Sequence, residues 1–290
     1  MSTVLSVVIP VARMAGKLTK FSNFLESLTP GKVEVIVILD LYDSATTSEL
    51  MEILSKLPLL RIKFCQDRFG SPGAARNAGL ALATSDWVWF CDADDEPSID
   101  TVLEKLTNVP AEYEILIFNY SKVNENSGIE ILNSGPHDLI SICLNPGLWR
   151  MLIRRDLIQD NKFEHYSLGE DQLFLLEIGI FHCKSLFIDK NVYKYSFGGL
   201  GHLVDRRDKV QDLYKVFVST FIELNKVGKE ESKYVSILAL RQLFTILKIG
   251  SSNMRALILN HLCWSLFRKP RNILKLLSAI PIFLRRQVAL

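Results

Sequence analysis

The sequence predicts an α/β fold, in which a mostly parallel sheet is flanked by helices and followed by a C-terminal helical extension. Two observations support this prediction. Short apolar, β-branched runs alternate with segments of helical period through the first two thirds of the chain, and only helical patterns follow from about residue 208. Strands that are buried on both faces and alternate with crossover helices are typical of a parallel sheet covered by helices on both sides. The composition agrees, since 48% hydrophobic and 23% charged residues in a chain of 290 are typical of a folded globular protein.

The first part of the chain supplies four strands and three helices, separated by polar or turn residues. The expected order is a strand over 5–11, a helix through 21–28, a strand over 33–39, a helix over 47–57, a strand over 60–65, a helix over 74–84 and a strand over 86–90. Before the third helix, Ser71 is placed to cap it and Pro72 to occupy its first position. Ligands of open parallel sheets bind at the carboxyl ends of the strands, which is where the stretch DADD lies.

The alternation weakens beyond residue 100. Strands are expected over 114–123 and 128–133, around the turn NENSG, then a helix over 169–182 and one strand or a pair over 185–196. Helices are expected at about 208–227, 233–249, 253–267 and 271–288, separated by GKEES, GSSN and KP. We therefore expect a first domain over 1–205 and a basic helical region over 206–290.

The net charge of +2 conceals an asymmetry along the chain. No Asp or Glu occurs from Ser232 to Leu290, where ten Lys and Arg residues lie, while the preceding part has 24 basic and 32 acidic residues, a net charge of −8. Within 270–290, basic residues surround apolar ones: Ile273, Leu274, Leu277, Ile280 and Leu284. Such a helix suits an anionic membrane surface, and the alternative is a helix packed on the rest of the chain with a solvated basic rim. Nucleic acid is not expected as a partner, because the segment is rich in Leu and Ile and has no known binding motif.

Three features bear on the compartment. The five cysteines are odd in number, scattered and without a C-x-x-C pair, which favours reduced thiols over a disulfide framework or a zinc site. The N-terminal apolar run has no basic region before it and no cleavage signal, so it is expected to be a strand and not a signal peptide. No window of 18 uninterrupted apolar residues predicts a membrane span. The expected location is cytoplasmic, peripheral at the inner face of the plasma membrane.

Clustered carboxylates follow the strand over 86–90, in the stretch FCDADDEP. On an extended segment Asp92 and Asp94 point the same way, so they can share one divalent cation while Asp95 turns aside. Mg2+ and Mn2+ prefer such carboxylate oxygens together with the oxygens of a bound phosphate. The alternative is a solvated acidic turn that ends at Pro97, before the next helix.

Two helix starts offer further candidates. The stretch GSPGAARNAG would present free N–H groups and the charge of Arg76 to an anion, or would only turn the chain. In LGEDQLF, Glu170 and Asp171 open a helix, where acids also complement the helix dipole in unrelated proteins. Sequence spacing alone does not bring Asp171 to the carboxylates of FCDADDEP.

Together, four stretches resemble the family 2 glycosyltransferases of the GT-A fold: LSVVIPV, EVIVILDLYDS, GSPGAARNAGLALATSDWVWFCDADDEP and FEHYSLGEDQLF. The resemblance covers about residues 5–200 and rests most on the A-R-N-x-G and D-x-D-D pairing. It implies a Rossmann-like GT-A sheet and an inverting, metal-assisted transfer of a sugar from a nucleotide-sugar donor, a UDP- or GDP-sugar. The implied acceptor is a glycan or a lipid-linked saccharide in cell-surface polysaccharide biosynthesis.

The resemblance also assigns roles to residues. It implies donor contacts after the first two strands and at the A-R-N and D-x-D positions: Pro10, Val11, Asp40, Asp43, Arg76, Asp92 and Ala93. Asp94 would be the principal ligand of Mn2+ or Mg2+, Asp171 the general base and Glu170 its neighbour and substitute. Inverting transfer needs a base for the acceptor hydroxyl and a Lewis acid for the leaving diphosphate, which these positions would provide. His202, in FGGLGH, is expected either to be an extra metal or diphosphate contact in a loop over the donor or to lie in a plain connector.

One segment departs from the family pattern. Members usually carry D-D-G-S after the second strand, whereas this chain has DLYDS, so either Asp40 or Asp43 is a candidate to contact the base. The departure keeps two alternatives open, a nucleotidyltransferase of similar α/β architecture and a catalytically degenerate nucleotide-binding scaffold. Trp149 is a candidate to stack on an acceptor sugar, with a core position as the alternative.

Overall fold

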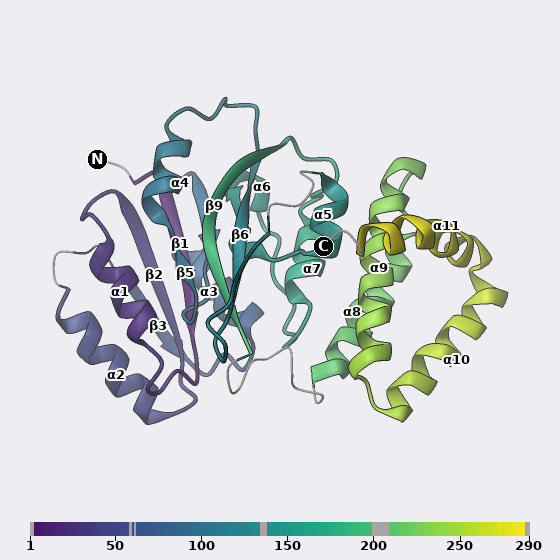
Figure 1. Cartoon of the computed structure of the whole chain (residues 1–290), viewed down its shortest axis with the longest axis horizontal. Helices are drawn as coiled ribbons and strands as arrows, with labels where there is room; N and C mark the ends of the chain where they lie inside the picture. Colours follow the sequence, from purple (N-terminus) through teal and green to yellow (C-terminus); the bar gives the residue numbers. More distant parts are fainter. Residues whose placement is uncertain (1–2, 58–59, 61, 134–137, 199–208, 288–290) are drawn as a thin grey trace. The chain divides into compact units, whose positions relative to one another are not determined.

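The structure is a computed structural model that describes residues 3–57, 60, 62–133, 138–198 and 209–287 (Figure 1). The chain forms two compact units, which are described separately. The first unit consists of Met1–Ser134, Gly147–His165 and His182–Gly199, and the second of Gly135–Pro146, Tyr166–Phe181 and Leu200–Leu290.

The first unit contains a nine-stranded sheet in the order β3-β2-β1-β4-β8-β6-β9-β5, with β7 paired to β6. Its first four strands are parallel and lie where the sequence places them: β1 (Leu5–Val11), β2 (Val33–Asp40), β3 (Ile62–Asp67) and β4 (Trp87–Phe90). β1 lies between β2 and β4, and the register sets Val11 opposite Leu39 and Val8 opposite Phe90. β1 and β2 are buried on both faces, which is why they read as continuous apolar runs.

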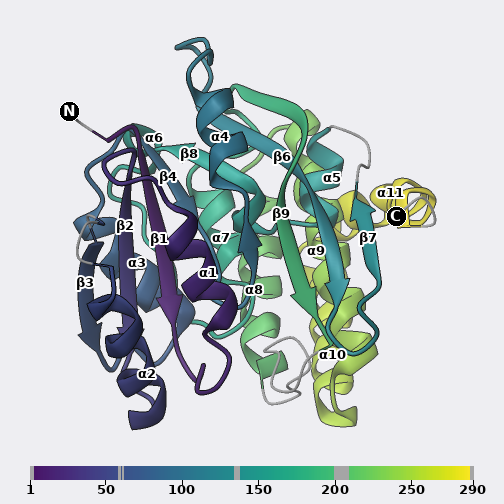
Figure 2. The same cartoon turned by 60° about the vertical axis from the view of Figure 1, so that its left-hand side comes forward.

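The rest of the sheet is mixed. β8 (Met151–Arg154) runs antiparallel to both of its neighbours, β4 and β6, and was not expected from the sequence. The remaining strands are β6 (Ile115–Asn124), which pairs in parallel with β9 (Ser185–Phe197), and two short antiparallel ones, β5 (Glu96–Pro97) on β9 and β7 (Glu130–Asn133) on β6. The predicted α/β fold class is therefore confirmed. Within the sheet, β8 runs in the direction opposite to its neighbour β4 (Figure 2).

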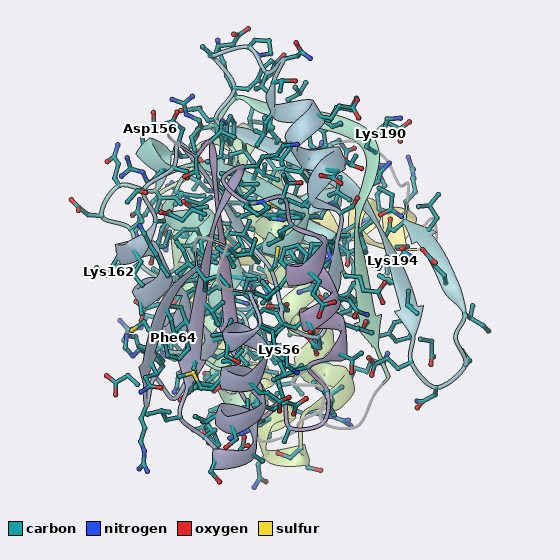
Figure 3. All side chains as sticks on the ribbon, turned by 90° about the vertical axis from the view of Figure 1, so that its left-hand side faces the viewer. Lys56, Phe64, Asp156, Lys162, Lys190 and Lys194 are labelled. Atoms are coloured by element: carbon teal, nitrogen blue, oxygen red, sulfur yellow. The ribbon has the colours of Figure 1, made fainter. Side chains whose placement is uncertain are left out.

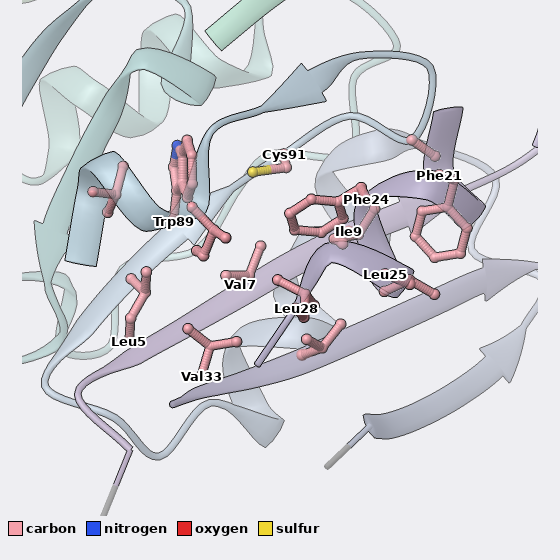
Figure 4. Packing of buried hydrophobic residues seen from close by; sticks show 14 of the residues in the cluster. Leu5, Val7, Ile9, Phe21, Phe24, Leu25, Leu28, Val33, Trp89 and Cys91 are labelled. Atoms are coloured by element: carbon pink, nitrogen blue, oxygen red, sulfur yellow. The ribbon is translucent and has the colours of Figure 1, made fainter. Parts of the chain in front are cut away.

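Helices cover both faces of the parallel strands. The helical segments of this unit are α1 (Thr19–Ser27), α2 (Ser44–Ser55), α3 (Pro72–Leu82), α4 (Ile99–Leu106), the single 3-10 turn Leu148–Arg150 and α6 (Arg155–Ile158). Val7 and Ile9 of β1 lie on the side of Phe24 and Leu25 of α1 (Figure 4), while Val8 between them meets α3. This alternation is the two-residue period of a strand buried between two layers.

The second unit is helical. It comprises α5 (Leu139–Leu144), α7 (Glu170–Glu177), α8 (Val210–Glu223), α9 (Lys229–Ile249), α10 (Ser252–Arg268) and α11 (Pro270–Gln287). One apolar cluster joins these helices, with Leu173 of α7, Phe217 of α8, Ile246 of α9 and Phe283 of α11 among its buried members. The C-terminal helices expected from the sequence are thus present. Among the helices within the described residues, none has the length and apolar character needed to cross a membrane.

α11 presents apolar side chains in two directions. Ile273, Leu276 and Phe283 are buried in the cluster of the second unit, whereas Leu274 and Leu277 are exposed. The sequence groups Ile273 with Leu274 on one apolar side, and the structure separates them because successive residues of a helix are about 100° apart.

Candidate active site

Three parallel strands end at one edge of the sheet in the first unit. β1 ends at Pro10 and Val11, β2 at Asp40, and β4 leads into Cys91 and Asp92. The connections from β1 run outward through β2 to β3, whereas β4 lies on the other side of β1, so the strand order reverses between β1 and β4. The carboxyl edge at such a reversal is the usual ligand site of open α/β sheets.

Residues 92–95 form a tight turn, which we call the acidic turn. The amide of Asp95 donates to the carbonyl oxygen of Asp92 at 3.2 Å, so the extended geometry expected for Asp92 and Asp94 is wrong. β4 ends at Phe90, and the turn sends Asp95 and Ala93 into the interior while Asp92 and Asp94 stay half-buried. The carboxylates of Asp92 and Asp94 are therefore accessible to a ligand, and that of Asp95 is not.

Strand β9 holds the acidic turn in place. Asp95 Oδ1 accepts a hydrogen bond from Ser196 N at 2.7 Å, and the hydroxyl of buried Tyr193 accepts one from Asp92 N at 2.9 Å. Burial raises the pKa of Asp95 well above its ordinary value, and the charges of Asp92 and Asp94 raise it further, although Ser196 and Tyr193 bond to its carboxylate. The repulsion that Asp92 and Asp94 exert on Asp95 favours a cation beside the acidic turn.

Helix α3 brings a positive charge to the acidic turn. Ser71 caps the helix through Ala74 N and Pro72 occupies its first turn, as expected from the sequence. Arg76, nearly buried, donates from Nη2 to Asp92 Oδ1 at 3.1 Å, and its guanidinium lies 5.7 Å from the ring centroid of Phe163. Arg76 thus lies directly against one carboxylate of the acidic turn.

The other residues of A-R-N-x-G fix the position of α3. The side chain of Asn77 donates to Phe163 O at 2.9 Å and accepts from Phe163 N at 2.8 Å, which ties α3 to a segment 86 residues away. At Gly79 an added Cβ would lie 2.3 Å from Val8 Cγ1, so only glycine allows the helix this close to β1. Asn77 and Gly79 therefore both contribute to the placement of Arg76.

The two candidate base-binding acids have different surroundings. Asp40 is buried, and its carboxylate accepts from the amides of Phe69 and Gly70 at 3.1 and 3.0 Å. Asp43 caps α2, with one carboxylate oxygen accepting from Thr46 N at 2.6 Å and the other from Thr46 Oγ1 at 2.9 Å. Asp40 lies at the carboxyl edge of β2, while both oxygens of Asp43 accept hydrogen bonds at the N-terminus of α2.

Sequence reasoning missed a pair of side chains at this edge. Tyr42, which follows β2, is 54% exposed, and the guanidinium of Arg13, which follows β1, lies 3.5 Å from its ring centroid. Arg13 has φ of 56°, a backbone conformation that is uncommon for residues other than glycine. An aromatic residue two positions after an apolar strand is the signal that could have indicated the pair.

Glu170 and Asp171 lie in the second unit, at the start of α7. Gly169, with φ of 88°, precedes them, so the chain enters the helix through a turn that favours glycine. Glu170 is buried, and Asp171 is half-buried with Oδ1 accepting from Gln172 N at 2.9 Å. The structure thus brings Asp40, Arg76 and the acidic turn together in the first unit and holds Glu170 and Asp171 in the second.

A buried polar network fixes α7 to the long helices of its unit. The Nε2 atom of Gln242 in α9 lies 3.0 Å from the Oε1 atom of Gln172 and 3.1 Å from the Oγ1 atom of Thr220 in α8. All three side chains are buried, so the loss of Gln242 would leave polar atoms without partners. The helical region therefore supports the short helix that carries Asp171.

Asp94 has the right chemistry for a hard divalent cation. In the part of the chain that the structure describes, no three His, Cys, Asp or Glu side chains gather into a cation site of their own. Mg2+ and Mn2+ take only one or two carboxylates when the remaining oxygens come from a phosphate, and Asp94 fits that requirement. His202, the second expected ligand, lies outside the described residues.

Trp149 lies within a group of aromatic rings. Its ring stacks on those of Tyr193 and Tyr195, at centroid distances of 5.0 and 5.2 Å. Its carbonyl oxygen accepts from Trp89 Nε1 at 2.7 Å. Trp149 therefore packs against the same strand that holds the acidic turn.

Comparisons with known proteins agree on one family. Residues 6–178 match the pattern of the family described as "Glycosyl transferase family 2". Glycosyltransferase GlyA of Streptococcus pneumoniae is 24% identical over 213 residues, which cover 66% of this chain and 30% of GlyA. Poly(ribitol-phosphate) beta-N-acetylglucosaminyltransferase TarS of Staphylococcus aureus is 23% identical over 255 residues, 81% of this chain and 43% of TarS. The chain thus spans less than half the length of these two relatives.

Solved structures show the same fold. Residues 1–349 of S. aureus TarS, in complex with UDP-GlcNAc, match with a TM-score of 0.66 and 19% identity over 96% of this chain and 80% of the other. The mannosyltransferase PcManGT of Pyrobaculum calidifontis, in complex with GDP-Man and Mn2+, matches with a TM-score of 0.59 and 16% identity over 97% and 87% of the two chains. The GT-A-like fold expected from the sequence is confirmed.

Proposed function

The chain belongs to glycosyl transferase family 2, and on that basis we propose that it transfers a sugar from a nucleotide-sugar donor to a hydroxyl group of a glycan or lipid-linked saccharide. The observation that carries the proposal is the acidic turn at the carboxyl end of β4, where the strand order reverses and Arg76 bonds to Asp92. Carboxylates and an arginine at such an edge suit a diphosphate accompanied by a cation.

We propose that the donor lies along the carboxyl edge of β1, β2 and β4. The relatives' structures contain UDP, UDP-GlcNAc or GDP-Man, which supports a UDP- or GDP-sugar. Pro10 and Val11 would border the base, Arg76 would face the diphosphate, and Asp92 and Ala93 would lie beside the ribose. Of the two candidate acids we favour Asp40 as the contact to the base, because Asp40 lies at the carboxyl edge of β2 whereas Asp43 caps α2.

Tyr42 adds a stacking surface to this donor site. Its ring is exposed, and the guanidinium of Arg13 lies 3.5 Å from the ring centroid. A flat exposed ring after β2 suits a nucleobase, since bases and aromatic side chains stack. We propose Tyr42 as a donor contact on that ground.

Asp94 would hold a divalent cation, Mn2+ or Mg2+, with His202 as a second contact. The diphosphate of a donor would bring further negative charge to a turn that already holds the carboxylates of Asp92 and Asp94, so a cation between them is needed. When bound, the cation would stabilise the negative charge of the leaving nucleoside diphosphate. The Mn2+ in PcManGT is consistent with this assignment.

Asp171 is proposed as the general base, with Glu170 as its neighbour. The acceptor oxygen attacks the anomeric carbon from the side opposite the diphosphate, forming one C–O bond as the other breaks, so the configuration inverts. The acceptor proton passes to the Asp171 carboxylate, and the electron pair of the broken bond leaves with the nucleoside diphosphate. Because Asp171 is half-buried and close to the surface, it can reach an acceptor hydroxyl.

The proposed setting is cell-surface polysaccharide synthesis at the cytoplasmic face of a membrane. All the proposed site residues fall within 1–205, which we propose as the catalytic domain, with 206–290 as the helical region. Residues 270–290 are proposed to meet an anionic membrane surface, on the strength of a C-terminal segment without acids.

A panel of UDP- and GDP-sugars, incubated with the protein, Mn2+ and acceptor extracts, tests the proposal. Release of nucleoside diphosphate with sugar in the acceptor is the expected result. Release of inorganic pyrophosphate would instead identify a nucleotidyltransferase. Binding of the donor without turnover would identify a catalytically degenerate scaffold.

A further inference from the structure

The corner between α10 and α11 exposes large apolar side chains. Only Lys269 separates the two helices, and around it Phe267 is 87% exposed, Leu274 65%, and Trp264 and Leu277 each 54%. Two of these side chains precede the break and two follow it by one or two turns. We call them the α10–α11 corner. Large apolar side chains grouped on a surface, with polar residues around them, mark an interaction site.

The exposed leucines of α11 belong to a second apolar stripe of that helix. Leu274, Leu277 and Leu284 are exposed and spaced by three and seven residues, so they share one side of the helix with exposed Pro281. The opposite side supplies Ile273, Leu276 and Phe283 to the core of the second unit. The exposed stripe is thus not required for packing within the unit.

α10 shows the same excess of exposed apolar surface. Of its seventeen residues, Ile258 and Ser265 are the buried ones, while Leu257, Leu259 and Leu266 are exposed. A helix that is apolar on most sides is normally covered, so its outer face is suited to a non-aqueous neighbour.

A basic groove adjoins the corner. It lies between α9 and α11, has a volume of about 500 Å3, and is lined by three lysines and by apolar side chains: Lys229, Lys233, Lys275, Leu274, Ala279 and Ile282. The ammonium group of Lys275 donates to the carbonyl oxygens of Leu224 and Val227, so Lys229 and Lys233, which are exposed, carry the charge that faces a ligand. Leu274 belongs both to the groove and to the corner, which makes the two surfaces continuous.

The sequence places only basic charges along the helices that form the corner. Arg268, Lys269 and Arg271 lie at the break itself, and the sequence has no acid from Ser232 onward. Glu230 and Glu231, in the first turn of α9, do not line the groove. Exposed apolar and aromatic side chains surrounded by basic residues match the interface of an anionic bilayer, where rings lie at the headgroup level and lysines meet phosphates.

We propose that the α10–α11 corner and the adjoining groove dock this chain on an anionic phospholipid bilayer, with apolar side chains shallowly inserted and a headgroup phosphate between Lys229 and Lys233. The proposal deepens the membrane part of the proposed function and moves it from residues 270–290 to a surface that includes α9 and α10. It does not depend on catalysis, because binding to lipid is measured without any donor.

Trp264 provides the reporter for the test. Trp87 and Trp89 are buried and Trp149 is half-buried, so Trp264 is the tryptophan of this chain with the most exposed ring. Adding phosphatidylglycerol vesicles to the full chain should shift its fluorescence to shorter wavelength, and the Trp264→Phe variant should lose that shift. Phosphatidylcholine vesicles should give neither the shift nor sedimentation with the vesicles.

Paired variants then locate the surface. Lys229→Ala with Lys233→Ala should lower affinity for the anionic vesicles about 30-fold, at about fivefold per basic residue near the membrane. Leu274→Glu with Leu277→Glu should abolish sedimentation without changing thermal unfolding, since both leucines lie outside the core. Two control variants should bind the vesicles as the wild type does. One is Lys162→Ala with Lys190→Ala, on the surface of the first unit (Figure 3), and the other is Leu132→Glu in β7.

Three results would overturn the proposal. They are equal binding to phosphatidylcholine, unchanged binding by the leucine pair, and a fluorescence shift that depends on protein concentration without vesicles, which would make the corner an interface between copies of the chain. Failure of sugar transfer with intact vesicle binding would count against the proposed function alone.

Discussion

Replacing Tyr193 by phenylalanine tests whether β9 positions the acidic turn. The hydroxyl accepts from Asp92 N at 2.9 Å, and burial, then Asp95 and Asp92, raise the pKa of Tyr193 well above its ordinary value, so the group keeps its proton and can donate to Asp95. Phenylalanine keeps the ring and its stacking on Trp149 at 5.0 Å but leaves the Asp92 amide without that acceptor. Loss of a buried partner costs about 1–3 kcal/mol.

Two measurements on Tyr193→Phe follow from that magnitude. Urea unfolding should show a free energy of unfolding lower by about 1–3 kcal/mol. Calorimetry should show donor affinity reduced about tenfold, because about 1.4 kcal/mol corresponds to a factor of ten. Tyr113→Phe, the same change at a half-buried tyrosine of the first unit, is the control and should alter neither quantity. A variant that is destabilised but binds the donor with unchanged affinity would show that the acidic turn is not the donor site.

Three further predictions concern catalysis, stability and donor binding. Asp171→Asn should bind donor normally and transfer sugar at least about 100-fold more slowly; rapid turnover would assign the base elsewhere. Burial alone would raise the pKa of Glu34, but hydrogen bonds from Lys63, Ser6 and Thr84 outweigh it and lower the pKa to about 2. The ionised carboxylate therefore contributes about 3 kcal/mol to the free energy of unfolding above pH 4.5, and this contribution is lost as the pH falls towards 2. The melting temperatures of the wild type and of Glu34→Gln should therefore approach one another as the pH is lowered. A difference in melting temperature that stays constant with pH would contradict this. Tyr42→Ala should weaken donor binding about tenfold, with stacking worth about 1–3 kcal/mol per base; unchanged calorimetric affinity would remove Tyr42 from the site.

The elements that sequence predicted correctly are those determined locally. Strands β1 and β2 are apolar runs because both faces are buried, and α3 begins where Ser71 and Pro72 can cap it. The alternation of strands and helices also predicted a ligand site at the carboxyl ends of the strands, and Asp40 and Asp92 lie at the ends of β2 and β4.

The contacts that define the site span long separations and could not be read from the sequence. Tyr193 and Asp92 are 101 residues apart, and Asn77 and Phe163 are 86 apart. The direction of β8 depends on pairing with β4 and β6 on either side, which no local pattern encodes. The turn at residues 92–95 replaced the expected extended segment because Asp95 is held in the interior by β9.

The exposed side of α11 shows the same limit of pattern reasoning. Helical spacing identifies an apolar face, but tertiary packing decides which apolar residues it covers. Ile273 is buried and Leu274 exposed, although they are neighbours in the chain. For this reason deletion of 270–290 would remove core side chains as well as the proposed docking surface, and the point variants described above are the sharper test.

Donor turnover by Asp94→Asn tests the central claim, that the acidic turn is the metal and diphosphate site of a sugar transferase. The assay measures nucleoside diphosphate release from the preferred donor across a series of Mn2+ concentrations, for wild type and variant. We expect wild-type release to rise with Mn2+ and release by the variant to be at background at every concentration. Equal, Mn2+-dependent release by the variant would contradict the assignment.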